Sequence, residues 1–514
     1  MNYNFQHVTY QTCNLNSLKL SLDSLFLHCG LFFQQFRQNF SNLIGLAFLS
    51  RQIVFALTVV VLLFISFSNH ALTAKTIYII QGSAPYLTFD SGQTRATNTE
   101  ALLGIYLSDG RTFTSTTHAS WRDPIVLPVA GQSFADIGMF VPTDTNFIEL
   151  SSLIGPPYNY WGDDDGDGQG VNGVTATGSL RLSIVDKNNR LVSRNTVLTI
   201  CNAPYRLTLS NTEGTLKTRY GVPNESLFSA NFYERQVTYY INPKATPVVC
   251  FAKPSLIYGG TNYSPDNYAG PANIWDIYDG FRVQSVTPSS YGLNFPTTGA
   301  NKLSFILDIG GNNKNLYWEP VSHGGITATM TSATNIRVVV TLTGPAVTDA
   351  SQWNSDNPDE IDRPSLPQTF ELVGRDGLGN VIVKYGFVLK QWFVTRGPRV
   401  YTNSSTTSWC RKIGDYRLPK VMDLTNATCQ SERDTCNGAV GATPSSSSNN
   451  YRRRIGAGFF TEWGSMGDYG NTSFYRWNYW TADKKDNTHF QVNAYNGQVF
   501  SFPGRDAYGM CVYP

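Results

Sequence analysis

Apolar and polar residues alternate along much of the chain, which predicts short β-strands. Clear alternating runs occupy residues 179–185, 237–241 and 336–342. A period of two residues is the pattern of a strand with one buried face. Turn-forming residues at 186–189 and 376–380 separate such runs, and long stretches with helical period are almost absent. The pattern therefore predicts a mainly β chain built from β-sandwiches.

One uninterrupted apolar run breaks this pattern near the start of the chain. Residues Ile53–Phe67 follow Arg51 and precede a small-residue segment that contains Ala71 and Ala74. The run is about fifteen residues long, shorter than the ~20 that a membrane-spanning helix needs. We expect residues 1–74 to be a leader with a secretory signal that is cleaved after Ala71 or Ala74. An uncleaved anchor in the same place is the alternative.

The remaining length predicts three domains. We expect a β-sandwich adhesion domain at 75–252, a second sandwich at 253–398, and a C-terminal module at 399–514. The first boundary precedes Pro254, and the second follows the strand-like segment that ends before Pro398.

Charge and histidine content exclude several function classes. The whole chain has a formal charge of +2, and the leader carries three Lys/Arg against one Asp, so the rest of the chain is neutral. A neutral chain has no net attraction for nucleic acid or anionic lipid. After the leader only His118, His323 and His489 remain, far apart in sequence. This argues against a zinc site and against catalysis that depends on histidine.

Six cysteines remain after the leader, and an even number in an exported chain predicts three disulfides and an oxidising location. We therefore expect the protein to be secreted or exposed on the cell surface. Cys201 and Cys250 each follow a predicted strand, and we expect them to pair inside the first domain. Such a bond is worth about 3–4 kcal/mol on the chain-entropy model.

A short acidic motif predicts a calcium site. Asp163, Asp165 and Asp167 alternate and are followed by Gly168. Oxygen ligands at every second position match the first half of a calcium loop. The twelfth position, where a bidentate Glu belongs, is Val174, so a complete EF-hand is excluded. A partial loop that binds structural calcium and an exposed acidic turn without metal both remain open.

The C-terminal module resembles a C-type-lectin-like domain. A short helix is expected from Pro419, strands are expected later, and a cysteine strand closes the chain. The resemblance implies that Cys410 pairs with Cys511 and that Cys429 pairs with Cys436, although six cysteines allow 15 pairings. The triplets through which calcium-dependent lectins of this fold bind sugar are absent from the module. We therefore expect protein recognition or calcium-free glycan binding.

An aromatic and basic cluster is the candidate recognition surface. Trp and Tyr are enriched at binding surfaces because they offer a large area at little entropy cost. The candidate contact residues are Arg476, Trp477, Tyr479, Lys484 and Lys485. Core packing is the alternative for the aromatic residues, and alternation on a strand predicts that Trp480 is buried.

Several segments resemble the enterobacterial intimin/invasin-like adhesins, in the form with an adhesion domain and Ig-like repeats. They are Tyr160–Gly173, Tyr220–Pro223, Tyr239–Ala245, Tyr291–Ala300, Pro364–Leu372 and Met510–Pro514. The resemblance implies tandem Ig-like β-sandwiches followed by an α+β C-type-lectin-like domain that binds a host receptor. No outer-membrane barrel or peptidoglycan-binding motif precedes the Ig-like region in this sequence. We therefore expect a released protein, or export through a separate barrel.

Three functions follow from these features. The first is a secreted or surface-exposed adhesin that binds a host cell-surface protein or glycan through its C-terminal module. The second is a secreted effector that docks on a separate bacterial outer-membrane β-barrel protein. The third, a glycan-active enzyme, is disfavoured because no recognisable nucleophile and base occur together.

Overall fold

The computed structural model describes residues 82–514, except 118–119, 167, 169–172, 231–234, 262–264 and 432–433. The expected leader and His118 lie outside this described part. Within it, the secondary structure is mainly β, which confirms the fold class expected from the alternating pattern. None of the helices in the described ranges has the length and apolarity needed to span a bilayer.

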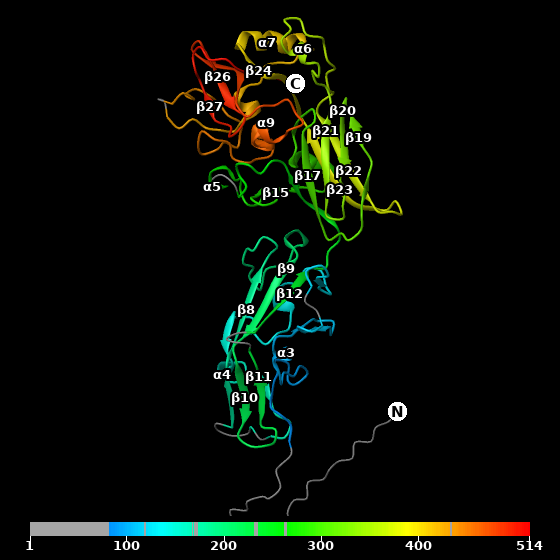
Figure 1. Ribbon diagram of the computed structural model, residues 1–514, viewed down its shortest axis with the longest axis vertical. Helices are drawn as coiled ribbons and strands as arrows, with labels where there is room; N and C mark the ends of the chain where they lie inside the picture. Colours follow the sequence, from blue (N-terminus) through cyan, green and yellow to red (C-terminus); the bar gives the residue numbers. More distant parts are fainter. Residues whose placement is uncertain are drawn as a thin grey trace, which may run out of the picture. The chain divides into compact units, whose positions relative to one another are not determined.

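The first domain is a β domain with a five-stranded sheet in the order β4-β12-β9-β8-β5 and a three-stranded sheet in the order β11-β10-β7 (Figure 1). Ile184, Leu207 and Tyr239 lie side by side across the three central strands of the larger sheet, and all three are buried. Its strands are β1 (Tyr86–Leu87), β2 (Ile105–Tyr106), β3 (Thr112–Phe113), β4 (Ile125–Val126), β5 (Phe147–Glu149), β6 (Trp161–Gly162), β7 (Val174–Thr177), β8 (Ser179–Val185), β9 (Tyr205–Asn211), β10 (Gly214–Thr218), β11 (Glu225–Phe228) and β12 (Arg235–Asn242). Its helical segments are α3 (Thr99–Leu102), η1 (Phe134–Asp136), α4 (Leu150–Leu153) and η2 (Ile200–Asn202).

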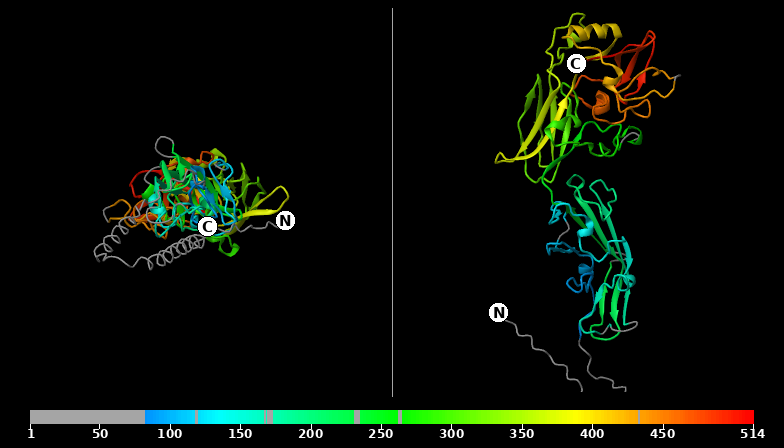
Figure 2. Two further views of the ribbon diagram at one scale, coloured as in Figure 1. Left: turned by 90° about the horizontal axis from the view of Figure 1, so that it is seen from below. Right: turned by 180° about the vertical axis from the view of Figure 1, so that it is seen from behind.

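The second domain is a sandwich of a seven-stranded sheet, β14-β15-β13-β17-β21-β20-β19, and a three-stranded sheet, β18-β22-β23. The hairpin of β22 and β23 reaches beyond its neighbours and exposes Leu378 at its turn (Figure 2). The strands are β13 (Val248–Lys253), β14 (Trp275–Asp276), β15 (Gly280–Arg282), β17 (Ser304–Gly310), β18 (Tyr317–Trp318), β19 (Val321–His323), β20 (Ile326–Thr331), β21 (Arg337–Thr343), β22 (Gln368–Arg375) and β23 (Val381–Leu389). The helical segments are α5 (Pro265–Tyr268), η3 (Pro288–Leu293) and α6 (Ala350–Trp353).

The C-terminal domain combines a six-stranded sheet, β16-β24-β28-β25-β26-β27, with short helices. One hydrophobic core runs through this domain and the second domain, whereas the first domain has a core of its own. The strands are β16 (Thr298–Ala300), β24 (Gln391–Tyr401), β25 (Asn478–Lys485), β26 (Thr488–Asn493), β27 (Val499–Phe500) and β28 (Ala507–Tyr513). The helical segments are α7 (Asn403–Lys412), α8 (Val421–Leu424), α9 (Phe459–Trp463) and η4 (Met466–Asp468).

Neither expected domain boundary falls between the sheets that the structure shows. Residues up to 252 were expected in the first domain, but β13 pairs with β15 and β17 of the second domain. The boundary expected at 398 lies inside β24, which pairs with both β16 and β28. Alternation identifies a strand but does not say which sheet the strand joins. The second and C-terminal domains are thus joined by a continuous strand instead of a linker.

The disulfide between Cys201 and Cys250 connects two domains. Cys201 lies in η2 of the first domain and Cys250 lies in β13 of the second domain. The pair is the one expected from the sequence, but its placement inside the first domain was wrong, because β13 belongs to the next sheet.

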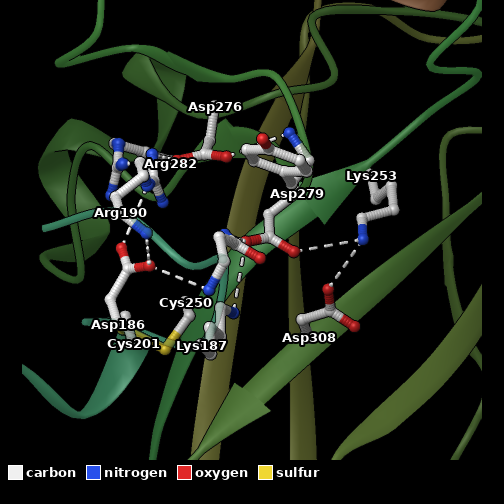
Figure 3. Close-up of polar contacts among 12 residues, drawn as sticks. Asp186, Lys187, Arg190, Cys201, Cys250, Lys253, Asp276, Asp279, Arg282 and Asp308 are labelled. Atoms are coloured by element: carbon white, nitrogen blue, oxygen red, sulfur yellow. Dashed lines mark hydrogen bonds and ion pairs between the residues drawn. A yellow bond between two sulfur atoms is a disulfide. The ribbon is translucent and has the colours of Figure 1, made fainter. Parts of the chain in front are cut away.

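Charged side chains surround this disulfide (Figure 3). Arg190, in the turn after β8, contacts Asp276 of β14 with an Nη1–Oδ2 distance of 2.8 Å. In the same turn, Lys187 contacts Asp279 at 3.2 Å, and Lys253 of β13 contacts the other oxygen of Asp279 at 3.3 Å. Asp276 and Asp279 are buried, so their charges need these partners. The first two domains are therefore joined by a covalent bond and by complementary charges.

This junction is expected to weaken in acid. Burial alone would raise the pKa of Asp279, but Asn188, Lys187 and Lys253 together lower it below its ordinary value of 3.8. A carboxyl with a lowered folded-state pKa contributes stability above about pH 4, and this stability is lost as the pH falls through the folded pKa. We expect Asp279→Asn to cost about 1–3 kcal/mol near pH 7, and less below pH 4, in urea unfolding. The exposed Asp359→Asn should cost little at either pH, and a pH-independent loss for Asp279→Asn would contradict this role.

Candidate binding surface of the C-terminal domain

The predicted contact residues lie at two ends of one strand. Arg476 and Trp477 immediately precede β25, whereas Lys484 and Lys485 end it and pair with the start of β26. A strand rises about 3.3 Å per residue, so roughly 20 Å separates the two pairs. All four side chains are exposed. The structure therefore splits the predicted surface into two places.

Tyr479 does not belong to either place. Its side chain is fully buried, and its ring lies 5.8 Å from that of Phe460 in α9. Its hydroxyl accepts a hydrogen bond from the backbone N–H of Tyr475 at 2.7 Å. Trp480 is buried, as its alternation predicted. Tyr479 therefore serves the core, and including it among the contact residues was wrong.

The end of β25 that carries Trp477 forms an aromatic patch, which we define as Tyr475, Arg476, Trp477 and Tyr508. Tyr475 is 42% exposed and Trp477 is 56% exposed. The ring of Tyr475 stacks on that of Tyr508 at 5.2 Å with an interplanar angle of 10°. The Arg476 guanidinium lies 5.8 Å from the centre of the Trp477 ring. The patch thus presents exposed aromatic area beside a positive charge.

The sequence analysis missed Tyr475 and Tyr508. The strand β25 begins only at Asn478, so residues 474–477 carry no strand pattern that would mark Tyr475 as exposed. Tyr508 is more than thirty positions away and reaches the patch because β28 pairs in parallel with β25, with Tyr508 opposite Tyr479. Such long-range pairing leaves no trace in local pattern.

Two disulfides tie this domain together. Cys410 of α7 bonds to Cys511 of β28, and Cys429 bonds to Cys436. These are the pairs that the resemblance to a lectin-like module implied. Asp434 lies close to Cys429 and Cys436, but their sulfurs are joined to each other and are not thiolate ligands for a metal.

Two buried ionisable residues of the C-terminal domain, Glu462 and Arg453, make several hydrogen bonds each. Glu462 of α9 accepts hydrogen bonds from Thr297 and Thr298 at 2.6–3.1 Å, and from the backbone N–H of Gly456 at 2.8 Å. Arg453 donates to the carbonyls of Ser255, Ile257, Tyr258 and Glu462. Both side chains are fully buried. The carbonyls of Ser255, Ile257 and Tyr258 belong to the second domain, so Arg453 ties the C-terminal domain to it.

The aspartates of the acidic motif in the first domain contact different partners. Asp164 contacts Arg95 at 2.5 Å and accepts a hydrogen bond from the Tyr86 hydroxyl. Asp163 Oδ2 accepts a bond from the Gly168 N–H, and Asp163 Oδ1 is buried without a partner among the described residues. Burial, with the nearby Asp165, raises the pKa of Asp163. Asp167 lies outside the described residues.

Comparisons with known proteins give weak similarity. No protein-family model matches the chain, and no curated protein matches it. The crystal structure of invasin, a bacterial integrin-binding protein, aligns with a TM-score of 0.32 and 13% identity over 67% of this chain and 52% of that chain. A 282-residue C-terminal fragment of intimin, in complex with the intimin-binding domain of the translocated intimin receptor, aligns with a TM-score of 0.28 and 11% identity. The alignment covers 66% of this chain and 95% of the intimin fragment. An intimin mutant of EHEC O157:H7 aligns with a TM-score of 0.24 and 13% identity, over 47% of this chain and 93% of the mutant chain. The alignment spans about half of the invasin chain, and scores this low define no function.

Proposed function

We propose that the protein is an adhesin-like binding protein that attaches to a protein on a host cell surface through the aromatic patch. The observation that carries the proposal is the exposure of Tyr475 and Trp477 on a domain whose other large aromatic rings are mostly buried. Water contact at such rings is unfavourable, and central aromatic and Arg residues dominate binding energy when a partner covers them. The residue-level resemblance to intimin/invasin-like adhesins points to the same function.

The support beneath the patch favours recognition by a preformed surface. Tyr475 is held by the hydroxyl of Tyr479 and by stacking on Tyr508. Arg476 packs beside Gly467 of η4, where an added Cβ would lie 3.0 Å from the Cβ of Arg476. A surface that is already ordered loses little side-chain entropy when it binds.

The experiment compares two kinds of partner. The fluorescently labelled chain is titrated onto cultured host cells and onto bacterial outer-membrane vesicles. The proposal predicts saturable binding to the host cells that protease treatment of the cells abolishes. Loss of binding after glycosidase treatment alone would favour a glycan partner. Saturable binding to the vesicles without host binding would establish docking on a bacterial outer-membrane protein and overturn the proposal.

We also propose that Asp163 and Asp165 hold a structural calcium ion. The residues fit, because Asp163 Oδ1 is buried without a hydrogen-bond partner among the described residues. Asp164 is engaged with Arg95 and Tyr86, whereas Asp165 accepts a hydrogen bond from the Ser83 N–H at 2.7 Å. A hard cation would supply a partner for Asp163 Oδ1.

Calcium is therefore expected to raise the melting temperature of the protein, and a chelator to lower it. Binding of the folded state at about 100 times Kd adds about 2.7 kcal/mol. Asp163→Asn combined with Asp165→Asn should abolish the response to calcium, whereas Asp164→Asn in the same loop should retain it. A wild-type melting temperature that ignores calcium would exclude the site.

A further inference from the structure

Arg194 of the first domain is a buried arginine that forms no ion pair within the described part of the chain. Arg194 follows β8 and is only 6% exposed. Its Nη1 donates to the carbonyls of Val141 and Pro142 at 2.8 and 2.7 Å. Its Nε is buried without a hydrogen-bond partner among the described residues, and the carboxylate of Asp144 interacts with the guanidinium only at longer range. Buried charges are usually paired, so this guanidinium retains unsatisfied donor capacity and charge.

The backbone fixes the arginine in place. The carbonyl of Arg194 accepts a hydrogen bond from the N–H of Ala135 in η1 at 3.0 Å, and the following turn is closed by the N–H of Thr196 on the carbonyl of Ser193 at 3.1 Å. The two carbonyls that bind Nη1 are neutral, so they orient the side chain without supplying a counter-charge. Burial lowers the pKa of Arg194, and the nearby Tyr160 and Asp144 offset part of this effect.

Arg194 borders a hollow on the surface of the first domain. The hollow has a volume of about 590 Å³, and besides Arg194 its lining includes Asn146, Ser183, Ser193 and Asn195. This volume falls in the range of small-molecule sites. Hydroxyl and amide groups can both donate to and accept from the hydroxyls of a sugar ring. Asp144, the one acid in this lining, accepts hydrogen bonds from the Tyr158 hydroxyl at 2.8 and 3.0 Å, which disperses part of its charge.

We propose that this hollow binds an acidic saccharide whose carboxylate pairs with Arg194 and whose hydroxyls bind the side chains of Asn146 and Asn195. A carboxylate matches the planar guanidinium and would supply an acceptor for the Nε–H, which has no partner among the described residues. The lining also includes Leu182, Leu191 and Val192, so it can contact both the hydroxyls and the C–H face of a sugar ring. This site lies in a different domain from the aromatic patch, so it provides a second and independent point of attachment.

The test titrates the full chain with D-glucuronic acid and D-glucose, which differ only in the carboxylate, by isothermal calorimetry. We expect glucuronic acid to bind at least tenfold more tightly than glucose. Arg194→Met should remove this preference, whereas Arg181→Met on β8, whose guanidinium lies over the Phe147 ring and outside the hollow, should retain it. Equal affinity for the two sugars, or an unchanged preference in Arg194→Met, would overturn the proposal.

Loss of stability could mimic loss of the site, so two exposed residues provide a second test. Asn146→Ala and Asn195→Ala alter side chains with no hydrogen bond to the rest of the described chain, and their melting temperatures should match the wild type. Each should weaken glucuronic acid binding about three- to tenfold. Wild-type affinity in both variants would show that the hollow is not the binding site.

Discussion

Glu462→Ala is expected to destabilise the protein by about 3–5 kcal/mol, measured by urea unfolding. The carboxylate is fully buried and accepts bonds from both the backbone and the hydroxyls of Thr297 and Thr298. Its removal leaves these donors without an acceptor in a region that water does not reach, and each unsatisfied buried donor costs about 1–3 kcal/mol. The loss should appear in the second and C-terminal domains together, because they share one core.

The matched control for this prediction is Glu360→Ala, which removes an exposed carboxylate and should change stability by less than about 0.5 kcal/mol. Glu462→Gln keeps the shape but replaces one acceptor oxygen with a donor, so we expect an intermediate loss. If Glu462→Ala unfolds at the wild-type urea concentration, Glu462 does not join the two domains in the way described.

Removing the bond between Cys410 and Cys511 is expected to have the second large effect. The bond joins residues 101 positions apart. On the chain-entropy model, a bond of this span stabilises the folded protein by about 4.7 kcal/mol, because it lowers the entropy of the unfolded chain. We expect the Cys410→Ser, Cys511→Ser double variant to lose about 3–5 kcal/mol of its free energy of unfolding. Cys511 lies in β28, which also pairs with β24.

The Cys429→Ser, Cys436→Ser double variant is the matched comparison. That bond spans only 7 positions, so its entropic contribution is smaller, about 2–3 kcal/mol. The account requires the long-range bond to contribute more stability than the short one. The reverse order in thermal or urea unfolding would show that the ends of the domain are held mainly by strand pairing.

Local pattern was sufficient for the strands but not for their assembly. The alternating run at 179–185 is β8. The short helix expected from Pro419 is α8, which begins two residues later, at Val421, and buries Val421 and Leu424. The sequence did not show that β13 leaves the first domain or that β24 continues into the C-terminal domain. Sheet membership depends on pairing between distant segments, and periodicity contains no information about the partner strand.

The residues that hold the candidate surface were the hardest to predict. Glu462 and Arg453 are charged, so composition alone favours exposure for both, yet both are fully buried. Tyr479 was expected at the surface because Trp and Tyr are enriched at binding surfaces. Only the three-dimensional neighbours separate Tyr479, which packs on Phe460, from Trp477, which faces outward.

The most direct test of the account is the host-cell binding isotherm of Trp477→Ala beside that of Leu378→Ala. Both substitutions remove a large exposed apolar side chain, one from the aromatic patch and one from the β22–β23 turn. An aromatic residue at the centre of an interface contributes about 2 kcal/mol or more, so we expect Trp477→Ala to weaken binding at least ~30-fold with an unchanged melting temperature. Leu378→Ala should bind as the wild type does. Wild-type affinity in Trp477→Ala would contradict recognition through the C-terminal domain.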